Sequence, residues 1–481
     1  MKRLFGISIL VMFSLVLFLS SCASSKQMDS LVKEDPMVPK KTTLDISGWW
    51  EGSLSLPGGS SLLLQFEVET AQEGYSSFLT VRQQGVHDLP VSTTSFDQSS
   101  NSFSLNIETI KATFAGNLDT ATDPYSIVGT FSQSGLDFPL VLEKKFTALI
   151  RPQDVSAPFP YISEDVEIPT ANGFSLAGTI TRPKDEGVHP AVILVTGSGL
   201  QDRNEELFGH KPFLVLADAL TKAGIVVLRC DDRGYGKSGG DGINATTFDF
   251  AQDAKAALSY LATMPYTEKD VLGVIGHSEG ALIAGILSAQ DPAISFIVLL
   301  SGPGLDGKDL LLQQSRAIMQ RQGLGQDQID AAVALNKTLY DIALDTATSQ
   351  EDRAKEIQSI LVKNGMSEKV ALQQSESLLS AWFNMFLAID PADYFSKITC
   401  PVLIVSGTND VQVPTEGNVK ALQDALAVNG NTHVTVKILE GLNHMLQPSV
   451  SGLPTEYESI ETTLDPSVLS LVPTWIHSLK H

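Results

Sequence analysis

The amino-acid sequence predicts an α/β protein in which a doubly wound, mostly parallel sheet follows a small all-β domain. Short, partly alternating apolar segments separated by turn residues fill residues 44–148. After a proline-rich linker at 149–160, continuous apolar runs alternate with helical patterns through 161–481, as in strands buried on both faces of a parallel sheet. Only helical patterns occur at about 307–390, so we expect an inserted helical cap.

Composition limits the class of protein. A chain of 481 residues exceeds one ordinary core, so we expect more than one domain. The hydrophobic content of 43% and charged content of 18% are typical of globular proteins. The formal net charge of −22 argues against a nucleic-acid partner, because the phosphate backbone would be repelled.

Residues 1–21 predict a signal peptide. Two basic residues precede an apolar core, Leu4–Leu19, which has the length of a signal peptide and is short for a membrane span. The next residues, Leu19-Ser20-Ser21-Cys22, resemble the lipobox of bacterial lipoproteins, which implies cleavage before Cys22 and lipid on its thiol. We therefore expect an exported protein that is lipid-anchored to the bacterial cell envelope, with a flexible tether over 22–43. An uncleaved anchor helix and ordinary secretion are the alternatives.

The first domain, 44–148, predicts a small antiparallel barrel or sandwich. Its clearest strand patterns are Leu62–Val68, Phe78–Val81, Phe103–Ile107 and Phe138–Leu142. Trp49 and Trp50 open the first strand, and core packing explains them better than ligand binding. We expect no chemistry in this domain.

The second domain begins with an antiparallel pair, Asp165–Ile168 and Phe174–Ile180, which turns at Asn172-Gly173. The expected parallel strands are Ala191–Val195, Ile225–Leu228, Val271–Ile275, Phe296–Leu300, Val402–Val405 and Val434–Ile438. The expected helices are Phe213–Ala223 and Phe248–Thr263, and in the cap Leu310–Arg321, Asp327–Leu344, Glu351–Lys363 and Ser367–Leu387. Such a cap either shapes a pocket and excludes water or is a decoration far from the site.

The most informative motif is Gly276-His277-Ser278-Glu279-Gly280, which lies between a predicted strand and a small-residue helical pattern. Strand, G-x-S-x-G and helix together predict a nucleophile elbow. The two glycines remove side-chain clashes at this tight turn, so Ser278 can present its hydroxyl above the sheet. The backbone N–H of Glu279 would face the same space and could stabilise an oxyanion.

A nucleophilic serine needs a base, and the base needs an orienting carboxylate. Groups that follow parallel strands converge at the carboxyl edge of the sheet. Asp410 follows the strand Val402–Val405, and His444 follows Val434–Ile438, so we expect both beside Ser278.

Each assignment has rivals. For the acid, these are Asp306 and Glu440. For the base, His277 should point away from the serine at such a turn, and His433 precedes its strand and so lies at the wrong edge. Spacing alone leaves His210 open.

The loop after the first parallel strand, Thr196–Arg203, should supply the second oxyanion donor. We nominate the Ser198 N–H, with Gly199 or Leu200 as near alternatives. A phosphate-binding reading is weak because the loop lacks a Gly-Lys-Ser/Thr ending. Arg233 is expected to brace loops by ion pairing.

The remaining cysteines, Cys230 and Cys400, are expected to be core thiols rather than a disulfide or a nucleophile. Nothing has metal-ligand spacing, so we expect no metal and no cofactor.

Several separated motifs resemble those of the α/β-hydrolase superfamily. They are the run Thr196–Arg203, the loop Asp232–Ser238, the elbow, the Asp410 loop and Gly441-x-x-His444. More closely, residues 160–481 look like bacterial esterases and dienelactone-hydrolase-like or serine-peptidase-like hydrolases with a leading β domain. The resemblance implies a Ser278-Asp410-His444 triad and an acyl-enzyme. Thr196-Gly197 departs from the His-Gly of many relatives, and the backbone donor is expected to survive that change.

The motifs together predict a serine hydrolase, specifically a carboxylesterase acting on a small-molecule acyl ester. A serine peptidase or acyl-peptide hydrolase would use the same triad and is the first alternative. A non-catalytic surface binding lipoprotein is the alternative of another class.

Overall fold

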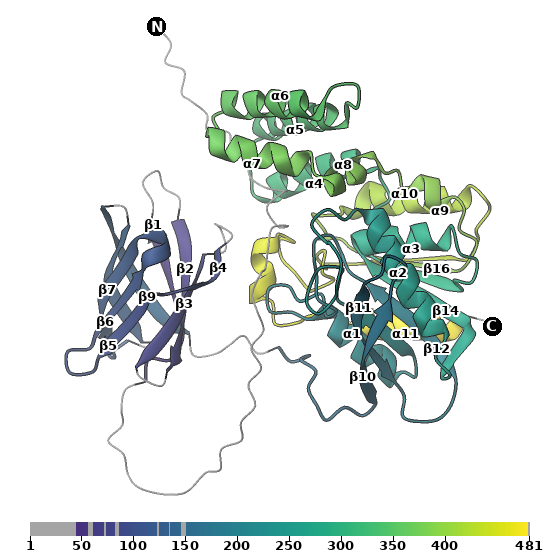
Figure 1. The fold of residues 1–481 in the computed structure, drawn as a ribbon, viewed down its shortest axis with the longest axis horizontal. Helices are drawn as coiled ribbons and strands as arrows, with labels where there is room; N and C mark the ends of the chain where they lie inside the picture. Colours follow the sequence, from purple (N-terminus) through teal and green to yellow (C-terminus); the bar gives the residue numbers. More distant parts are fainter. Residues whose placement is uncertain are drawn as a thin grey trace, which may run out of the picture. The chain divides into compact units, whose positions relative to one another are not determined.

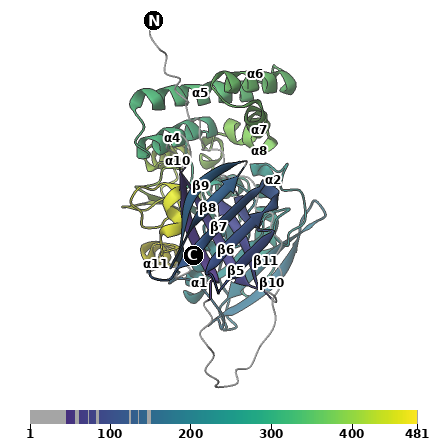
Figure 2. The same cartoon turned by 90° about the vertical axis from the view of Figure 1, so that its left-hand side faces the viewer.

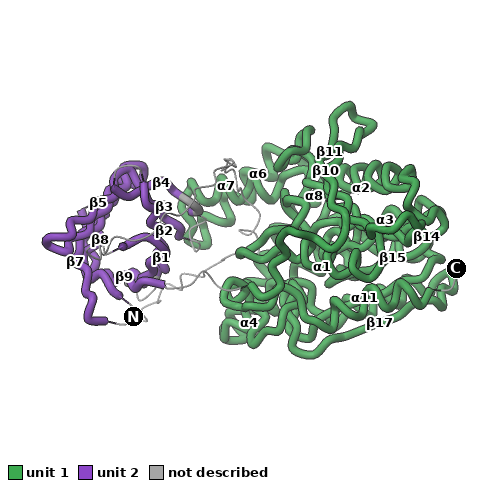
Figure 3. Tube along the Cα trace, turned by 90° about the horizontal axis from the view of Figure 1, so that it is seen from below, with its two compact units in different colours: residues 1–18, 151–481 green, residues 19–150 purple. Residues whose placement is uncertain are grey.

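The computed structural model describes residues 45–55, 61–71, 74–81, 86–122, 125–133, 135–145 and 151–479. The chain divides near residue 150 into two compact units, called here the barrel unit and the sheet unit (Figure 3). The expected signal peptide, lipid-bearing Cys22 and the tether lie outside the described residues. No helix in the described ranges has both the length and the apolar character needed to cross a membrane.

The barrel unit is a closed antiparallel sheet. Its strands are β1 (Gly48–Ser55), β2 (Ser61–Thr70), β3 (Tyr75–Val81), β4 (Val86–Pro90), β5 (Thr93–Asp97), β6 (Ser102–Ile107), β7 (Ala112–Asp119), β8 (Ser126–Gln133) and β9 (Leu136–Lys145). Their order is β2-β1-β9-β8-β7-β6-β5-β3-β4, in which β9 to β5 lie side by side in Figure 2. Pairing of β2 with β3 closes the ring. Trp50 is fully buried, and its indole N–H donates to the Ile46 carbonyl over 2.8 Å. The barrel, and not the sandwich, is therefore the correct alternative, and Trp50 belongs to its core.

The sheet unit contains an eight-stranded sheet of order β10-β11-β13-β12-β14-β15-β16-β17. Its strands are β10 (Ile162–Pro169), β11 (Ser175–Arg182), β12 (His189–Val195), β13 (Val226–Cys230), β14 (Thr267–His277), β15 (Phe296–Leu300), β16 (Val402–Gly407) and β17 (Val434–Leu439). β11 is antiparallel to both of its neighbours, and the strands from β13 to β17 are mutually parallel. The winding direction reverses beside β12 and β14, so their carboxyl ends border the crevice where ligands bind in such sheets.

Helices cover both faces of this sheet (Figure 1). One face carries a core shared with α1 (Pro212–Lys222) and α11 (Pro466–Ser478). The other face packs on α2 (Thr247–Ala262), α3 (Glu279–Ser288), α9 (Ala392–Phe395) and α10 (Thr415–Ala427). Because β14 and β15 are buried on both faces, they present continuous apolar runs, as the sequence predicted.

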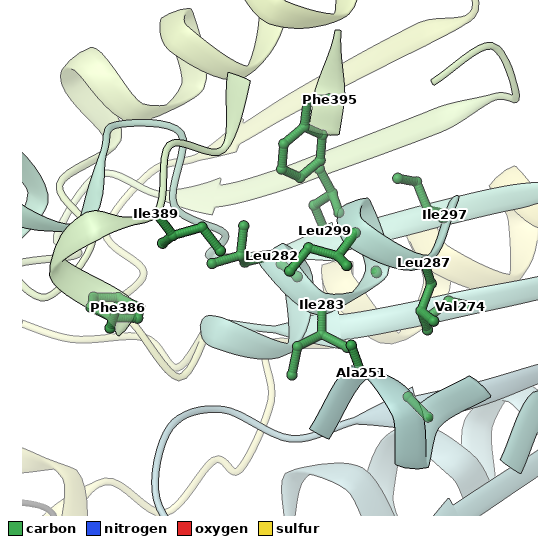
Figure 4. Packing of buried hydrophobic residues seen from close by; sticks show 14 of the residues in the cluster. Ala251, Val274, Leu282, Ile283, Leu287, Ile297, Leu299, Phe386, Ile389 and Phe395 are labelled. Carbon is green, nitrogen blue, oxygen red and sulfur yellow. The ribbon is translucent and has the colours of Figure 1, made fainter. Parts of the chain in front are cut away.

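The helical cap lies between β15 and β16, as expected. It consists of α4 (Gly307–Arg321), α5 (Gln326–Leu344), α6 (Gln350–Lys363), α7 (Glu368–Leu378) and α8 (Ala381–Ala388). The prediction of a single helix over Ser367–Leu387 is wrong, because the helix ends after α7. A new helix, α8, begins where the Ser380 hydroxyl accepts the Phe383 N–H over 3.2 Å. Phe386 of α8 and Ile389, which follows it, belong to the same apolar cluster as Leu282 and Ile283 of α3, so the cap and the helix of the elbow share one core (Figure 4).

The described part of the expected linker, 151–160, contains no helix or strand but is bound to the sheet unit. The Arg151 guanidinium donates to the carbonyl oxygens of Phe208, Glu458 and Ile460. Gln153 exchanges hydrogen bonds with the backbone of Leu464. These bonds tie residues 151–153 to the sheet unit.

Candidate active site

Ser278 occupies a strained turn between β14 and α3. Its φ of 55° and ψ of −119° are values that residues other than glycine rarely adopt, which costs about 1–3 kcal/mol. Its N–H donates to the Leu300 carbonyl over 2.9 Å. A Cβ atom at Gly276 would overlap the Gly280 carbonyl, and one at Gly280 would overlap the Val195 carbonyl. The turn therefore requires both glycines, because any larger residue would clash with the backbone.

Asp410 and His444 form a buried pair at the same edge of the sheet. Asp410 lies in the loop after β16 and His444 in the loop after β17, and their side chains are 0% and 6% exposed. His444 Nδ1 is 2.8 Å from Asp410 Oδ2. The other carboxylate oxygen accepts the N–H groups of Gln412 and Val413 over 2.9 and 2.8 Å. A carboxylate held in this way keeps the proton on Nδ1 and leaves Nε2 able to accept a proton.

His277, the residue before Ser278, lies against His444. The ring of His277, adjacent to Ser278, has its centroid 4.9 Å from that of His444. The His277 Nε2 atom lies 3.0 Å from the His444 carbonyl oxygen. Within the described ranges, Ser278 is half-buried and its hydroxyl makes no direct hydrogen bond to His444. Catalytic hydrogen bonds are often long before substrate binds, so the absence of a direct bond is compatible with a serine–histidine pair.

The loop after β12 runs directly beside the serine. A Cβ atom at Gly197 would lie 3.2 Å from the Ser278 Cβ. Among the described residues, the N–H groups of Ser198, Gly199 and Leu200 have no acceptor, so all three nominated donors stay available. The Gly197 N–H is already used, because it donates to Glu205 over 2.8 Å.

Two aspartates brace this loop. Thr196, which departs from the His-Gly of the family that the chain resembles, donates to Asp232 over 3.0 Å. The Gln201 N–H donates to the same carboxylate over 2.8 Å. Burial raises the pKa of Asp232 well above its ordinary value. Arg203 binds the neighbouring Asp231 through two guanidinium nitrogens at 2.8 and 2.9 Å. The loop thus keeps a defined shape without the histidine.

The Glu279 carboxylate is a site feature that sequence reasoning missed. As the first residue of α3, Glu279 has an N–H without an intrahelical acceptor, as an oxyanion donor requires. Its side chain is buried and accepts from Thr247 over 2.6 Å and from the cap residue Trp382 over 2.9 Å. Burial raises the pKa of Glu279, while hydrogen bonds from Thr247, Trp382 and Ser198 oppose the rise. No motif marks a lone tryptophan in a cap as a partner of the elbow.

The rival residues have other partners. Asp306 caps α4 by accepting the Asp309 N–H over 3.0 Å, and both Glu440 and His433 are exposed. His210 is buried between the Thr463 hydroxyl and the Tyr457 carbonyl, at 3.0 and 2.9 Å. His277 is buried against Glu205.

The remaining expectations concern bracing and core groups. Arg233 binds Asp253 through two guanidinium nitrogens at 2.6 and 2.8 Å, which confirms bracing by ion pairing. Cys230 and Cys400 are free thiols, and burial raises the pKa of Cys230 to about 12. In the part of the chain that the structure describes, no group of three His, Cys, Asp or Glu side chains could hold a metal ion.

Comparisons with known proteins show what the chain is similar to. The family model described as serine aminopeptidase, S33, matches residues 211–448. A curated relative, esterase EstD of Thermotoga maritima, is 26% identical over 317 residues, or 64% of this chain. The match spans 66% of the relative, just under two thirds of its length. An uncharacterized 31.7 kDa protein of Escherichia coli is 25% identical over 260 residues, 52% of this chain and 83% of that protein. A solved structure of the Pyrococcus furiosus esterase Pf2001 is 22% identical, with a TM-score of 0.40, over 69% of this chain and 99% of its own. The chain therefore has the α/β-hydrolase fold, and its sequence is similar to the serine aminopeptidase, S33, family model and to a curated esterase.

Proposed function

We propose that this protein is a serine hydrolase, specifically a carboxylesterase that cleaves small acyl esters through Ser278, His444 and Asp410. The observation that carries the proposal is the buried 2.8 Å Asp410–His444 pair, at the sheet edge where the elbow presents Ser278. The relative named as an esterase supports an ester rather than an amide as the substrate.

The reaction would proceed in two acyl-transfer steps. His444 Nε2 takes the Ser278 proton as Oγ attacks the acyl carbonyl, and Asp410 stabilises the resulting imidazolium. The N–H groups of Glu279 and Ser198 bind the oxyanion. The alcohol then leaves with the proton from His444, and an acyl-enzyme remains. Water, deprotonated by His444, attacks this ester and releases the acid, which regenerates Ser278.

Serine replacement tests the mechanism. S278A should lower hydrolysis of a short p-nitrophenyl ester by about a thousandfold or more. A fluorophosphonate probe should label the native protein and not S278A. The matched control is S288A in the same helix, whose hydroxyl lies against the Cys400 thiol at 3.2 Å, and it should stay active. Near-full activity of S278A would refute the triad, and a folded native protein without labelling would favour the non-catalytic binding lipoprotein.

A peptidase is the second candidate, favoured by the aminopeptidase description of the matched family. Both reactions use one triad, so substrates must separate them. We expect kcat/KM for a p-nitrophenyl acyl ester to exceed that for an aminoacyl p-nitroanilide on the same preparation by more than the intrinsic reactivity difference. A preference for the aminoacyl amide would reassign the protein as a peptidase.

The N-terminal pattern supports a second proposal, on location. The residues Leu19-Ser20-Ser21-Cys22 fit export followed by lipid attachment to Cys22. In a bacterial host, radioactive palmitate should label the full chain, and C22S should abolish the label and release the protein from the membrane fraction. C400S is the matched control and should keep the label. Unchanged labelling of C22S would exclude the anchor.

A further inference from the structure

A second histidine–carboxylate pair lies beneath the elbow. The side chains of Glu205 and His277 are 2% and 9% exposed, and His277 Nδ1 is 2.9 Å from Glu205 Oε1. The same Oε1 accepts the Gly197 N–H over 2.8 Å. On the other side of the ring, His277 Nε2 is 3.0 Å from the His444 carbonyl oxygen, which also accepts the Ser301 hydroxyl over 2.8 Å. One pair therefore connects the oxyanion loop, the end of β14 and the loop of the base.

The partners of the ring indicate where its protons lie. A carbonyl oxygen can only accept, so Nε2 must carry a proton to bind the His444 backbone. Nδ1 faces a carboxylate oxygen, and a neutral imidazole has only one N–H group. The Glu205 oxygen that faces Nδ1 also accepts the Gly197 N–H, which favours an ionised carboxylate and therefore a doubly protonated His277.

The surrounding charges agree with this assignment. Burial lowers the pKa of His277, but the charge and hydrogen bond of Glu205, the His444 carbonyl and the charge of Asp410 together raise it above the ordinary value. The other titratable group at the ring is the His444 imidazole, at 4.9 Å between centroids.

We propose that Glu205 and His277 are positioning residues for the proposed hydrolysis, in which a doubly protonated His277 fixes the His444 backbone while Glu205 fixes the oxyanion loop. The inference rests on the proposed triad. His277 is not the base, since both of its nitrogens are occupied. It acts by holding the peptide of the residue that is the base.

Strained backbone conformations surround Glu205 and His277, which together are called the clamp below. Ser278, Ser301, Leu446 and Glu205 have φ values of 55°, 50°, 57° and 55°. Positive φ at residues other than glycine persists only where the surroundings enforce it. Three of the four belong to this cluster: Glu205 itself, Ser278, which follows His277, and Ser301, which donates to the same His444 carbonyl as His277. A displacement of about 1 Å at such a site costs about a hundredfold in rate, so loss of the clamp should be visible in kcat.

Nitrogen NMR on histidine-labelled full-length protein tests the protonation state directly. The native protein at pH 7 to 8 should show one imidazole with both nitrogens protonated, and H277Q should lack that signal. E205Q should convert it to a neutral ring. A neutral His277 ring in the native protein at pH 7 would overturn the proposal, even if every variant failed to fold.

Kinetics test the positioning role. E205Q should lower kcat by about 10- to 100-fold with KM changed by no more than about twofold, because the substrate pocket itself is intact. The control is D185N at the opposite end of β12, where Asp185 Oδ1 lies 2.9 Å from His189 Nε2 and accepts the Gly187 N–H over 2.9 Å. D185N makes the same carboxylate-to-amide change beside a histidine and a glycine N–H, away from the site, and should leave both constants unchanged. A fully active E205Q beside an inactive S278A would overturn this inference alone, whereas an active S278A would overturn the proposed function.

Discussion

The indole of Trp382 in the cap donates to both carboxylate oxygens of Glu279, over 2.9 and 3.1 Å. Glu279 directly follows Ser278, and its backbone N–H is the proposed oxyanion donor. Trp382 also stacks on Phe386, with centroids 5.2 Å apart, which links this contact to the apolar core of the cap. Trp382 of α8 thus contacts Glu279, the first residue of the elbow helix. Through this contact the cap can influence both substrate choice and the oxyanion site.

Replacing Trp382 with phenylalanine should expose this coupling. W382F keeps an aromatic ring but deprives a buried carboxylate of a donor, which we expect to destabilise the fold by about 1–3 kcal/mol and to lower kcat for the ester. The control is W475F in α11, where the lost indole N–H donates to the Thr435 hydroxyl over 3.1 Å. W475F should lower stability in chemical denaturation without a change in kcat. Wild-type kinetics for W382F would show that the cap does not act through Glu279.

The buried Glu279 charge should make stability depend on pH. Its folded-state pKa is raised above the ordinary 4.5, so ionisation costs stability as the pH rises from 4.5 through the raised value. No cationic side chain of the described residues lies within ion-pair distance to offset that cost.

E279Q should therefore gain stability over the native protein at neutral pH and lose that advantage below pH 4.5, where the native carboxyl is protonated. Urea unfolding across this range measures the difference. E440Q, at an exposed position, should show no such trend. An E279Q protein that is less stable than the native one at pH 7 would mean that the hydrogen bonds outweigh the desolvation.

An amide at position 410 should impose the wrong histidine tautomer. In D410N the side-chain oxygen can still accept from Gln412 and Val413, while the NH₂ group faces His444 Nδ1. The imidazole proton then moves to Nε2, which can no longer accept the serine proton. We expect kcat to fall by about 10³- to 10⁴-fold with little change in Tm.

D306N is the matched control, because asparagine caps a helix as well as aspartate does. It should keep normal esterase activity. Loss of activity in D306N together with activity in D410N would exchange the roles of the two aspartates.

Protonation of His277 should contribute stability at low pH. Because its folded-state pKa is raised above 6.5, the contribution is complete below pH 6.5 and is lost as the pH rises through the raised value. H277Q should therefore be most destabilised relative to the native protein near pH 6 and less so at alkaline pH. Denaturant titrations at both pH values measure this, with H433Q, at an exposed position, as the control. A constant difference would mean that His277 does not change its charge on folding.

The sheet unit should fold without the barrel unit. Its hydrophobic clusters contain no residue of the barrel core among the described residues, and Arg151 is bonded within it. A chain starting at residue 151 should melt cooperatively and hydrolyse the p-nitrophenyl ester with kcat close to that of the full chain. Failure to fold, with the longer chain stable, would assign a structural role to the barrel.

The elbow and the Asp410–His444 pair were predictable from the sequence because their causes are local. Gly276 and Gly280 are demanded by clashes within one turn, and the ends of parallel strands must meet at one edge whatever surrounds them. The strands themselves followed from apolar runs that only a sheet buried on both faces can satisfy. The same local reasoning failed at Ser380, because a single capping serine interrupted an otherwise continuous helical pattern.

Only the tertiary structure decided which groups support the site. Glu205 contacts His277 across 72 residues, and Trp382 contacts Glu279 across 103. No sequence motif predicts either contact, because both depend on how the cap and the loops pack after the strands have paired. The nucleophile is thus set by the conformation of five consecutive residues, whereas the clamp around His277 and the cap contact on Glu279 exist only once remote segments share one core.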